Sequence, residues 1–283
     1  MAQDPSETPV DETSTNPGGD VEMTEEGAAP EVQEVAADGS ELPFAGEAHV
    51  VPPRVSFMAY LASPIVHLVV GQGEQQTMLA AHQALLVKSP FFDSACQSFV
   101  DDGSPRQIEL PDEDIDAVGG FLEYLYTGEY FPKKLPGQRT LETDASLPAV
   151  DDSGDQLLKH ARIYTLAEKL GVSPLKSLAS SKIHCVNSTA KGEITYARYV
   201  YAHTSSNDTT VRAPIASFWA TRSHMLRSEA EDEFKSLCLE YPQFGYDVLT
   251  RVLDEKLKRE RSDKMHPATA SARKRARHSS GAA

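Results

Sequence analysis

The chain has 283 residues and a formal net charge of −15, from 27 Lys and Arg against 42 Asp and Glu. This length allows one or two domains. No apolar run approaches the roughly 20 residues that span a bilayer, and the N-terminus lacks the pattern of a secretory signal, so we expect an intracellular protein without a membrane partner. The cysteines Cys96, Cys185 and Cys238 are too few and too far apart for a disulfide framework or a zinc module.

Acidic and basic residues are separated along the sequence. Residues 1–53 contain thirteen acidic side chains, no Lys or Arg and few large apolar groups, which predicts a disordered acidic tail over residues 1–55. Residues 251–283 carry a net charge of +6. Because the two ends contribute −13 and +6, residues 54–250 retain a charge of −8. An acidic body disfavours direct nucleic-acid binding.

The first structured segment is predicted to be a β-hairpin. Residues 65–70 (IVHLVV) are apolar and β-branched and precede Gly71-Gln72-Gly73, a pattern typical of a strand that enters a tight turn. Residues 77–81 form the returning strand in this interpretation, and a short helix opens at His82.

A second small helix, a short strand and a longer helix are predicted next. Ser89 precedes a proline and is a suitable N-cap. Residues 107–110 (QIEL) are short and extended. Asp112 or Asp114 can cap the longer helix, in which apolar residues recur at i, i+3, i+4 and i+7 until Gly128 ends it.

Residues 134–154 are dense in Pro, Gly, Asp and Ser and keep no period, which predicts an inserted, mobile loop. Helical periodicity resumes at Asp155 and continues to Gly171, a suitable C-terminal cap. Ser173-Pro174 starts another helix that runs to about Val186. We expect these two helices to form a hairpin behind the sheet.

Five motifs occur in an ordered series: LVVG at 68–71, H-x-x-L-L-x-x-S-P-F-F at 82–92, IELPD at 108–112, Y-L-Y-T-G at 124–128 and LLKHARIYTLAEKLGV at 157–172. Their order and spacing resemble those of a BTB/POZ domain over residues 56–188. The acidic start, the inserted loop and the basic end resemble the single-domain BTB proteins of fungi.

The resemblance implies an α+β fold, in which a small, mostly three-stranded sheet packs on a cluster of helical hairpins. It implies that His82 is buried at the start of the first core helix. It also implies that Ser89-Pro90-Phe91-Phe92 holds the next helix against the sheet. The structural core residues would be His82, Leu85, Ser89, Pro90, Phe91, Phe92, Leu125, Tyr126 and Gly128. It also implies protein–protein interaction without catalysis: homo- or heterodimerisation, recruitment of transcriptional regulators, or bridging of a substrate to a cullin-type ubiquitin ligase.

Two positions depart from the family pattern. Many dimeric members pair an Asp before the first strand with a basic residue ahead of the S-P motif. Here Lys88 is kept but Ile65 occupies the acidic position, so we expect Lys88 to point outward. Cullin-binding members carry an apolar-x-Glu signature after the second small helix. Here the match is Phe99-Val100-Asp101 or, in a second register, Val100-Asp101-Asp102, with the shorter Asp in place of Glu. The residues that would contact a cullin are therefore Phe99, Val100, Asp101 and Asp102.

Residues 189–257 have helical rather than strand spacing. An aromatic segment at 194–201, the single tryptophan Trp219 beside Phe218, and apolar residues between 234 and 253 predict a small helical extension on the last helical hairpin. The alternative is that this apolar face is a partner-binding groove.

Residues 258–283 are predicted to be a basic disordered tail. Within it, Arg273, Lys274, Arg275 and Arg277 form a compact basic cluster among Ala and Ser, which suits the acidic groove of an import receptor. This interpretation predicts that the protein is in the nucleus, either exclusively or in both nucleus and cytoplasm. The alternative is a solvated charged tail.

No catalytic, cofactor or metal site is indicated. Cys96 and His82 are close in sequence, but a Cys among Phe residues is typical of packing. We expect Asp151, Asp152 and Asp155 to remain solvated in or beside the loop. The sequence therefore predicts a non-enzymatic interaction scaffold, acting in transcription-associated complexes. The alternatives are a cullin-ligase substrate adaptor and a homo-oligomerisation module.

Overall fold

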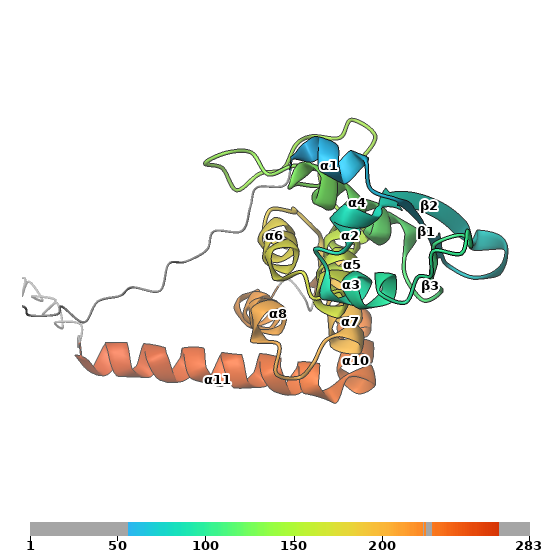
Figure 1. The fold of residues 1–283 in the computed structure, drawn as a ribbon. Helices are drawn as coiled ribbons and strands as arrows, with labels where there is room; N and C mark the ends of the chain where they lie inside the picture. Colours follow the sequence, from blue (N-terminus) through green and yellow to red (C-terminus); the bar gives the residue numbers. More distant parts are fainter. Residues whose placement is uncertain (1–55, 223, 225–227, 266–283) are drawn as a thin grey trace, which may run out of the picture. The chain divides into compact units, whose positions relative to one another are not determined.

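The computed structural model describes residues 56–222, 224 and 228–265, in which a small sheet is joined to a series of helices (Figure 1). The predicted acidic tail over residues 1–55 and the basic cluster at residues 273–277 lie outside the described residues. The first helix, α1 (Phe57–Leu61), is five residues long and is capped by the Ser56 hydroxyl, which accepts a hydrogen bond from the Ala59 amide. This helix was not predicted from the sequence.

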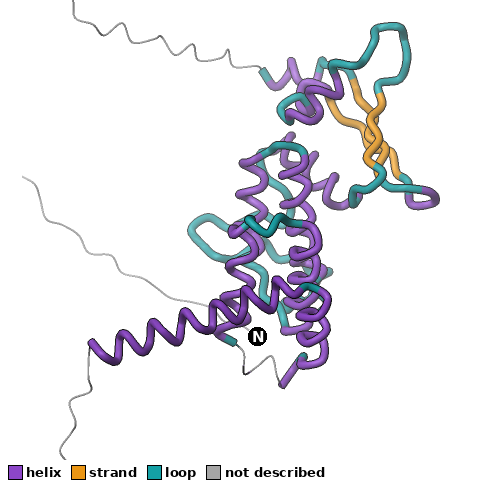
Figure 2. Tube along the Cα trace, turned by 90° about the horizontal axis from the view of Figure 1, so that it is seen from below, coloured by secondary structure: helices purple, strands orange, loops and turns teal. Residues whose placement is uncertain are grey.

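The sheet has three strands in the order β2-β1-β3. The central strand β1 (Ile65–Val70) pairs antiparallel with β2 (Thr77–His82) and parallel with β3 (Gln107–Leu110). Figure 2 draws the strands in orange. In this register Leu68 lies opposite Leu79 on one side and Ile108 on the other. The predicted bounds of β1 and β3 are those observed, and β2 ends one residue later than predicted.

Alternation along β1 fixes which face of the sheet meets the core. Val66, Leu68 and Val70 are fully buried, because side chains two residues apart point to the same face. Two short helices, α2 (Gln83–Leu86) and α3 (Pro90–Cys96), follow β2.

The helix α4 (Ile115–Thr127) follows the last strand of the sheet. Asp114 caps it by accepting a hydrogen bond from the Ala117 amide at 2.9 Å, so Asp114 rather than Asp112 is the N-cap. Gly128 ends α4 with a φ of 79°, a left-handed conformation that glycine adopts without strain. The aromatic ring of Phe121 stacks on Phe92 with centroids 5.6 Å apart, which joins α4 to α3.

The predicted helical hairpin consists of α5 (Asp155–Lys169) and α6 (Ser173–Ile183). The turn between them contains Gly171, with a φ of 72°. A Cβ at this position would lie 3.1 Å from Pro90, so glycine lets the turn pack closely on the start of α3. The second helix ends at Ile183, earlier than the predicted Val186.

The end of the predicted loop 134–154 is folded against the helices. Asp151 is 1% exposed, and its carboxylate accepts hydrogen bonds from the amides of Gly154 and Leu157 at 2.9 and 3.0 Å. The expectation that Asp151 stays solvated is therefore wrong. Its carboxylate satisfies amides at the start of α5 that have no helical partner, and a negative charge is favoured there.

The helical extension consists of α7 (Ala190–His203), α8 (Thr209–Thr221), α10 (Glu231–Glu240) and α11 (Pro242–Met265). As predicted, it packs on the hairpin, because α7 contacts α5. Within the extension, α8 contacts α11. Trp219 is fully buried and lies against Phe218, Phe234 and Phe244. Residues 258–265 belong to α11, which corrects the predicted start of the unstructured tail at residue 258. The architecture is α+β, as the sequence predicted.

Candidate protein-interaction site

An apolar surface lies at the start of the described chain. Three large apolar side chains of α1 and the first side chain of β1 are exposed, with Met58 at 72%. No residue of α1 is buried. We call this surface the α1 face, and its residues are Phe57, Met58, Leu61 and Ile65.

Local hydrogen bonds hold α1 against the start of α2. The Ser63 hydroxyl donates to the Tyr60 carbonyl at 2.7 Å and accepts from the Ala84 amide at 3.1 Å. The Gln83 amide donates to the Pro64 carbonyl at 2.9 Å. The apolar residues of α1 are thus presented on a helix with a fixed position relative to α2.

Lys88 borders this region. Its side chain is exposed, and the Lys88 Nζ lies 4.3 Å from the centroid of the Tyr60 ring. The expectation that Lys88 points outward is confirmed. A cation over an aromatic face is favourable without an ionic partner, which explains how Lys88 is accommodated although Ile65 stands where a carboxylate was expected.

The loop after α3 displays part of the predicted cullin contact. Val100 is 68% exposed and Asp101 and Asp102 are exposed, whereas Phe99 is half-buried and packs against the core. The Asp102 carboxylate accepts a hydrogen bond from the Ser104 amide at 2.9 Å. Hydrogen bonds from Ser104 hold the pKa of Asp102 below its usual value, so this carboxylate is ionised.

Arg106 anchors the same loop. Its guanidinium donates to the Gln83 side chain and forms an ion pair with Asp101. Asp101 therefore has a partner within the chain, whereas Val100 and Asp102 face outward. Of the two registers that the sequence allowed for an apolar-x-acidic pair, the geometry favours Val100 with Asp102 over Phe99 with Asp101.

The residues assigned to the structural core divide into three groups by burial. Leu85, Ser89, Phe92 and Leu125 are buried. Phe91, Tyr126 and His82 are half-buried, and Pro90 and Gly128 are exposed because they shape helix ends rather than fill the interior.

His82 is not the fully buried histidine that the resemblance implied. It ends β2 and precedes α2, and its Nδ1 lies 2.6 Å from the Tyr126 hydroxyl. The same hydroxyl accepts a hydrogen bond from the His82 amide at 3.1 Å. His82 and Tyr126, both predicted as structural, thus tie the strand end to α4.

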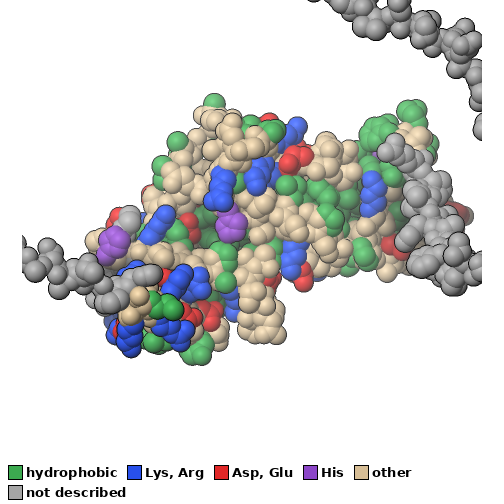
Figure 3. All heavy atoms as spheres, turned by 90° about the vertical axis from the view of Figure 1, so that its left-hand side faces the viewer, with side chains coloured by type: hydrophobic (Ala, Val, Ile, Leu, Met, Phe, Trp, Pro, Cys, Tyr) green, Lys and Arg blue, Asp and Glu red, His purple; other side chains and the backbone are tan. Residues whose placement is uncertain are grey.

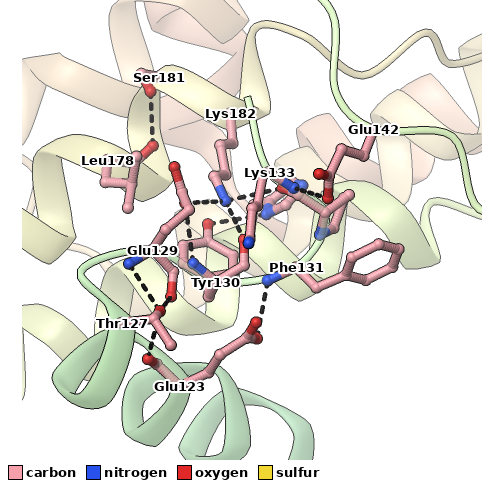
Figure 4. Close-up of polar contacts among 12 residues, drawn as sticks. Glu123, Thr127, Glu129, Tyr130, Phe131, Lys133, Glu142, Leu178, Ser181 and Lys182 are labelled. Carbon is pink, nitrogen blue, oxygen red and sulfur yellow. Dashed lines mark hydrogen bonds and ion pairs between the residues drawn. The ribbon is translucent and has the colours of Figure 1, made fainter. Parts of the chain in front are cut away.

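A buried ionic cluster lies behind the end of α4 and was not predicted (Figure 4). Lys182 on α6 is fully buried, and its Nζ lies 2.5 Å from the Glu129 carboxylate. It also donates hydrogen bonds to the backbone carbonyls of Tyr130 and Pro132. The Glu123 carboxylate accepts from the Phe131 amide at 2.8 Å. These contacts fix the chain where it leaves α4 for the loop.

Two aromatic side chains of the cluster have perturbed ionisation. His160 Nδ1 lies 2.9 Å from the Tyr130 hydroxyl, and both residues are buried. Burial, helped by the charges of Lys182 and Lys159, lowers the pKa of His160 to about 3. Burial also raises the pKa of Tyr130. Both groups are neutral near pH 7, which is the state that suits an enclosed structural site.

A groove of about 1160 Å³ lies between the end of the sheet and helices α5 and α7. Three cations on its walls are each paired with a carboxylate: Arg162 with Asp114 at 3.0 Å, Lys169 with Glu113 at 2.5 Å, and Lys176 with Asp208 at 3.5 Å. Pairing neutralises these charges, so the groove offers a mixed polar surface rather than a cluster of free cations for an anion.

Burial raises the pKa of the Cys96 thiol, which keeps it in the less nucleophilic protonated form. No group of His, Cys, Asp and Glu suited to hold a metal ion occurs among residues 56–222, 224 and 228–265. Within those same ranges, none of the helices has both the length and the apolar content needed to cross a membrane.

Comparison with known proteins agrees with this architecture. Residues 66–183 match the family model described as BTB/POZ domain. No curated protein matches the chain. The matched range begins at the second residue of β1 and ends with α6, so it includes the helical hairpin and all of the sheet except Ile65. The chain therefore contains a BTB/POZ domain, a module of protein–protein interaction.

Proposed function

We propose that the chain is a non-enzymatic interaction scaffold that acts in transcription-associated complexes in the nucleus. The α1 face is the observation that carries this proposal. Soluble proteins rarely leave neighbouring large apolar side chains exposed unless a partner covers them. The rigid attachment of α1 to α2 also limits the entropy that binding would cost.

The partner that best fits the α1 face is a second BTB/POZ domain, identical or related. The face is apolar throughout, with Ile65 in place of the carboxylate that many dimeric members use. Burial of Phe57, Met58 and Leu61 against similar residues would supply the affinity, and Lys88 would remain at the rim.

Light scattering of the full chain tests this partner. Met58→Asp places a charge in the α1 face and is expected to lower the average mass. Met78→Asp is the matched control, because Met78 is 59% exposed on β2 and lies outside the α1 face. Equal masses for wild type and Met58→Asp would rule out the α1 face as the site of association.

The nuclear part of the proposal is supported by charge. Arg273, Lys274, Arg275 and Arg277 form the basic cluster, while residues 54–250 carry a net charge of −8. An acidic body suits recruitment through other proteins rather than through DNA phosphates. Replacing the four basic residues by Ala is expected to move the protein from nucleus to cytoplasm. An unchanged nuclear fraction would exclude this import signal.

The alternative function is that of a substrate adaptor for a cullin-type ubiquitin ligase. It is favoured by the outward position of Val100 and Asp102 on a loop that Arg106 anchors. A pull-down with the purified cullin scaffold tests it. Val100→Arg is expected to abolish capture and Leu239→Arg, on the exposed side of α10, to preserve it. A wild-type chain that never captures the cullin would exclude the adaptor.

A further inference from the structure

The last helix has an apolar stripe on the side that faces away from the protein. Phe244 and Val248 on α11 are buried. At 100° per residue, the opposite side of the helix carries residues spaced by three and four positions. We call these residues the α11 stripe, and they are Tyr246, Leu249, Leu253 and Leu257, all of them exposed.

The C-terminal half of α11 lacks support from the rest of the described chain. Figures 1 and 2 both show it continuing past α8 with no other described element beside it. From residue 251 to 265, every described residue is exposed apart from Glu255, which is half-buried. An isolated helix of this length is marginal in water, so a partner that covers the stripe would also stabilise the helix.

The charges along one side of the α11 stripe indicate which kind of partner would cover it. By helical spacing, Asp247, Arg251 and Asp254 share a flank with Lys258 and Arg261. Both carboxylates of this flank lie toward its N-terminus, and its C-terminal end is basic. Figure 3 shows hydrophobic, basic and acidic side chains together at the end of α11. A surface that carries both halves of a complementary pattern is suited to a second copy of itself.

We propose that α11 pairs antiparallel with α11 of a second copy of this chain, about a two-fold axis at Leu253. In this arrangement Leu253 meets Leu253, and Leu249 meets Leu257. Leucines at i, i+4 and i+8 form a ridge of the kind that packs between helices. An antiparallel pair also brings the basic end of each flank beside the Asp247 end of the other.

Other occupants fit the surface less well. A parallel pair would set the basic C-terminal halves of two helices side by side, where like charges repel. An anionic membrane surface would meet Asp254 and Glu260 beside the apolar residues, and carboxylates there are repelled by acidic lipids. The proposed surface is distinct from the α1 face, so the two associations can be tested separately.

Disulfide cross-linking of the full chain tests the geometry. Leu253→Cys is expected to give a disulfide-linked dimer, because two-fold pairing places the two copies of residue 253 together. Glu260→Cys is expected to give none, because antiparallel pairing separates its two copies by about 21 Å along the helix axis. Wild type, with its three native cysteines, is the control for other disulfides. No cross-link from Leu253→Cys, or equal cross-links from both variants, would overturn the proposal.

Light scattering of Met58→Asp variants tests whether the α11 stripe contributes to association when the α1 face is disrupted. In that background, a further Leu253→Asp change is expected to convert a dimer into a monomer. Leu239→Asp is the matched control, because Leu239 is 74% exposed on α10 and lies outside the stripe. A Met58→Asp protein that is already monomeric at its highest soluble concentration would contradict the proposal, even if the α1 face mediates association as proposed above.

Discussion

Lys182 and Glu129 form an ion pair in which the lysine side chain is fully buried and the glutamate side chain is 27% exposed. Because Lys182 also donates to two backbone carbonyls, one side chain on α6 determines the path of the chain after α4. The pair therefore connects the BTB/POZ hairpin to the segment that leads into the inserted loop.

Removing the lysine should destabilise the fold. Lys182→Met leaves the Glu129 carboxylate and two carbonyls without their donor, and breaking a buried pair in this way costs about 3–5 kcal/mol. The control is Lys169→Met, which breaks the surface pair with Glu113 and should cost about 1 kcal/mol or less. Urea unfolding measures both free energies, and equal losses would show that Lys182 has no special structural role.

His160 should make the protein sensitive to acid. Its pKa in the fold is about 3, against an ordinary value of 6.5. Between pH 6.5 and pH 3, the His160 side chain is protonated in the unfolded chain but not in the folded one. The free energy of unfolding therefore falls by up to about 1.4 kcal/mol per pH unit as the pH drops below 6.5. His160→Gln removes this contribution. If wild type and His160→Gln lose equal stability between pH 7 and pH 5, His160 is not the sensitive group.

Glu193 should make the fold less stable as the pH rises, the opposite of the effect expected of His160. Burial raises its pKa to about 7, although the charge of Arg222 lowers it. The folded chain keeps a proton that the unfolded chain releases, so this residue reduces stability as the pH rises from 4.5 through 7. Glu193→Gln should be about 1–3 kcal/mol more stable than wild type at pH 8, with a smaller difference at pH 4. A variant that is less stable at pH 8 would contradict this assignment.

Ser89 should contribute more than an exposed serine with a similar bond. Its hydroxyl donates to the Leu170 carbonyl at 2.6 Å and is buried. Ser89→Ala leaves that carbonyl unpaired, at a cost of about 1–3 kcal/mol. Ser98→Ala removes a comparable bond to the Ala95 carbonyl on the surface, where water can replace it. Thermal unfolding that shifts equally for both variants would refute the role of Ser89.

Most of the fold was predictable because its signals are local. A run of apolar, β-branched residues before Gly71 predicted the first strand. Gly128 and Gly171 predicted helix ends, and both have the left-handed conformation that such ends require. Helical periodicity predicted the α5–α6 hairpin, and the size and apolar character of Trp219 predicted a core anchor. The helix α1 was missed because five residues are too few to show a period.

The remaining features depend on contacts between distant residues. Nothing near Lys182 in the sequence indicates that Glu129 lies beside it. The burial of Asp151 follows from the fold of the loop onto α5, which composition alone cannot show. The outward positions of Val100 and Asp102 depend on Arg106, which binds Asp101 and the start of α2. For α11, charge content suggested a tail although the helix continues to Met265.

Hydrogen exchange of the full chain, measured in dilute and in concentrated solution, tests the central claim that the α1 face binds a second BTB/POZ domain. If it does, amides of Phe57–Leu61 should exchange more slowly as the average mass rises. Exchange in α1 that stays the same while the protein associates would show that the interaction surface lies elsewhere.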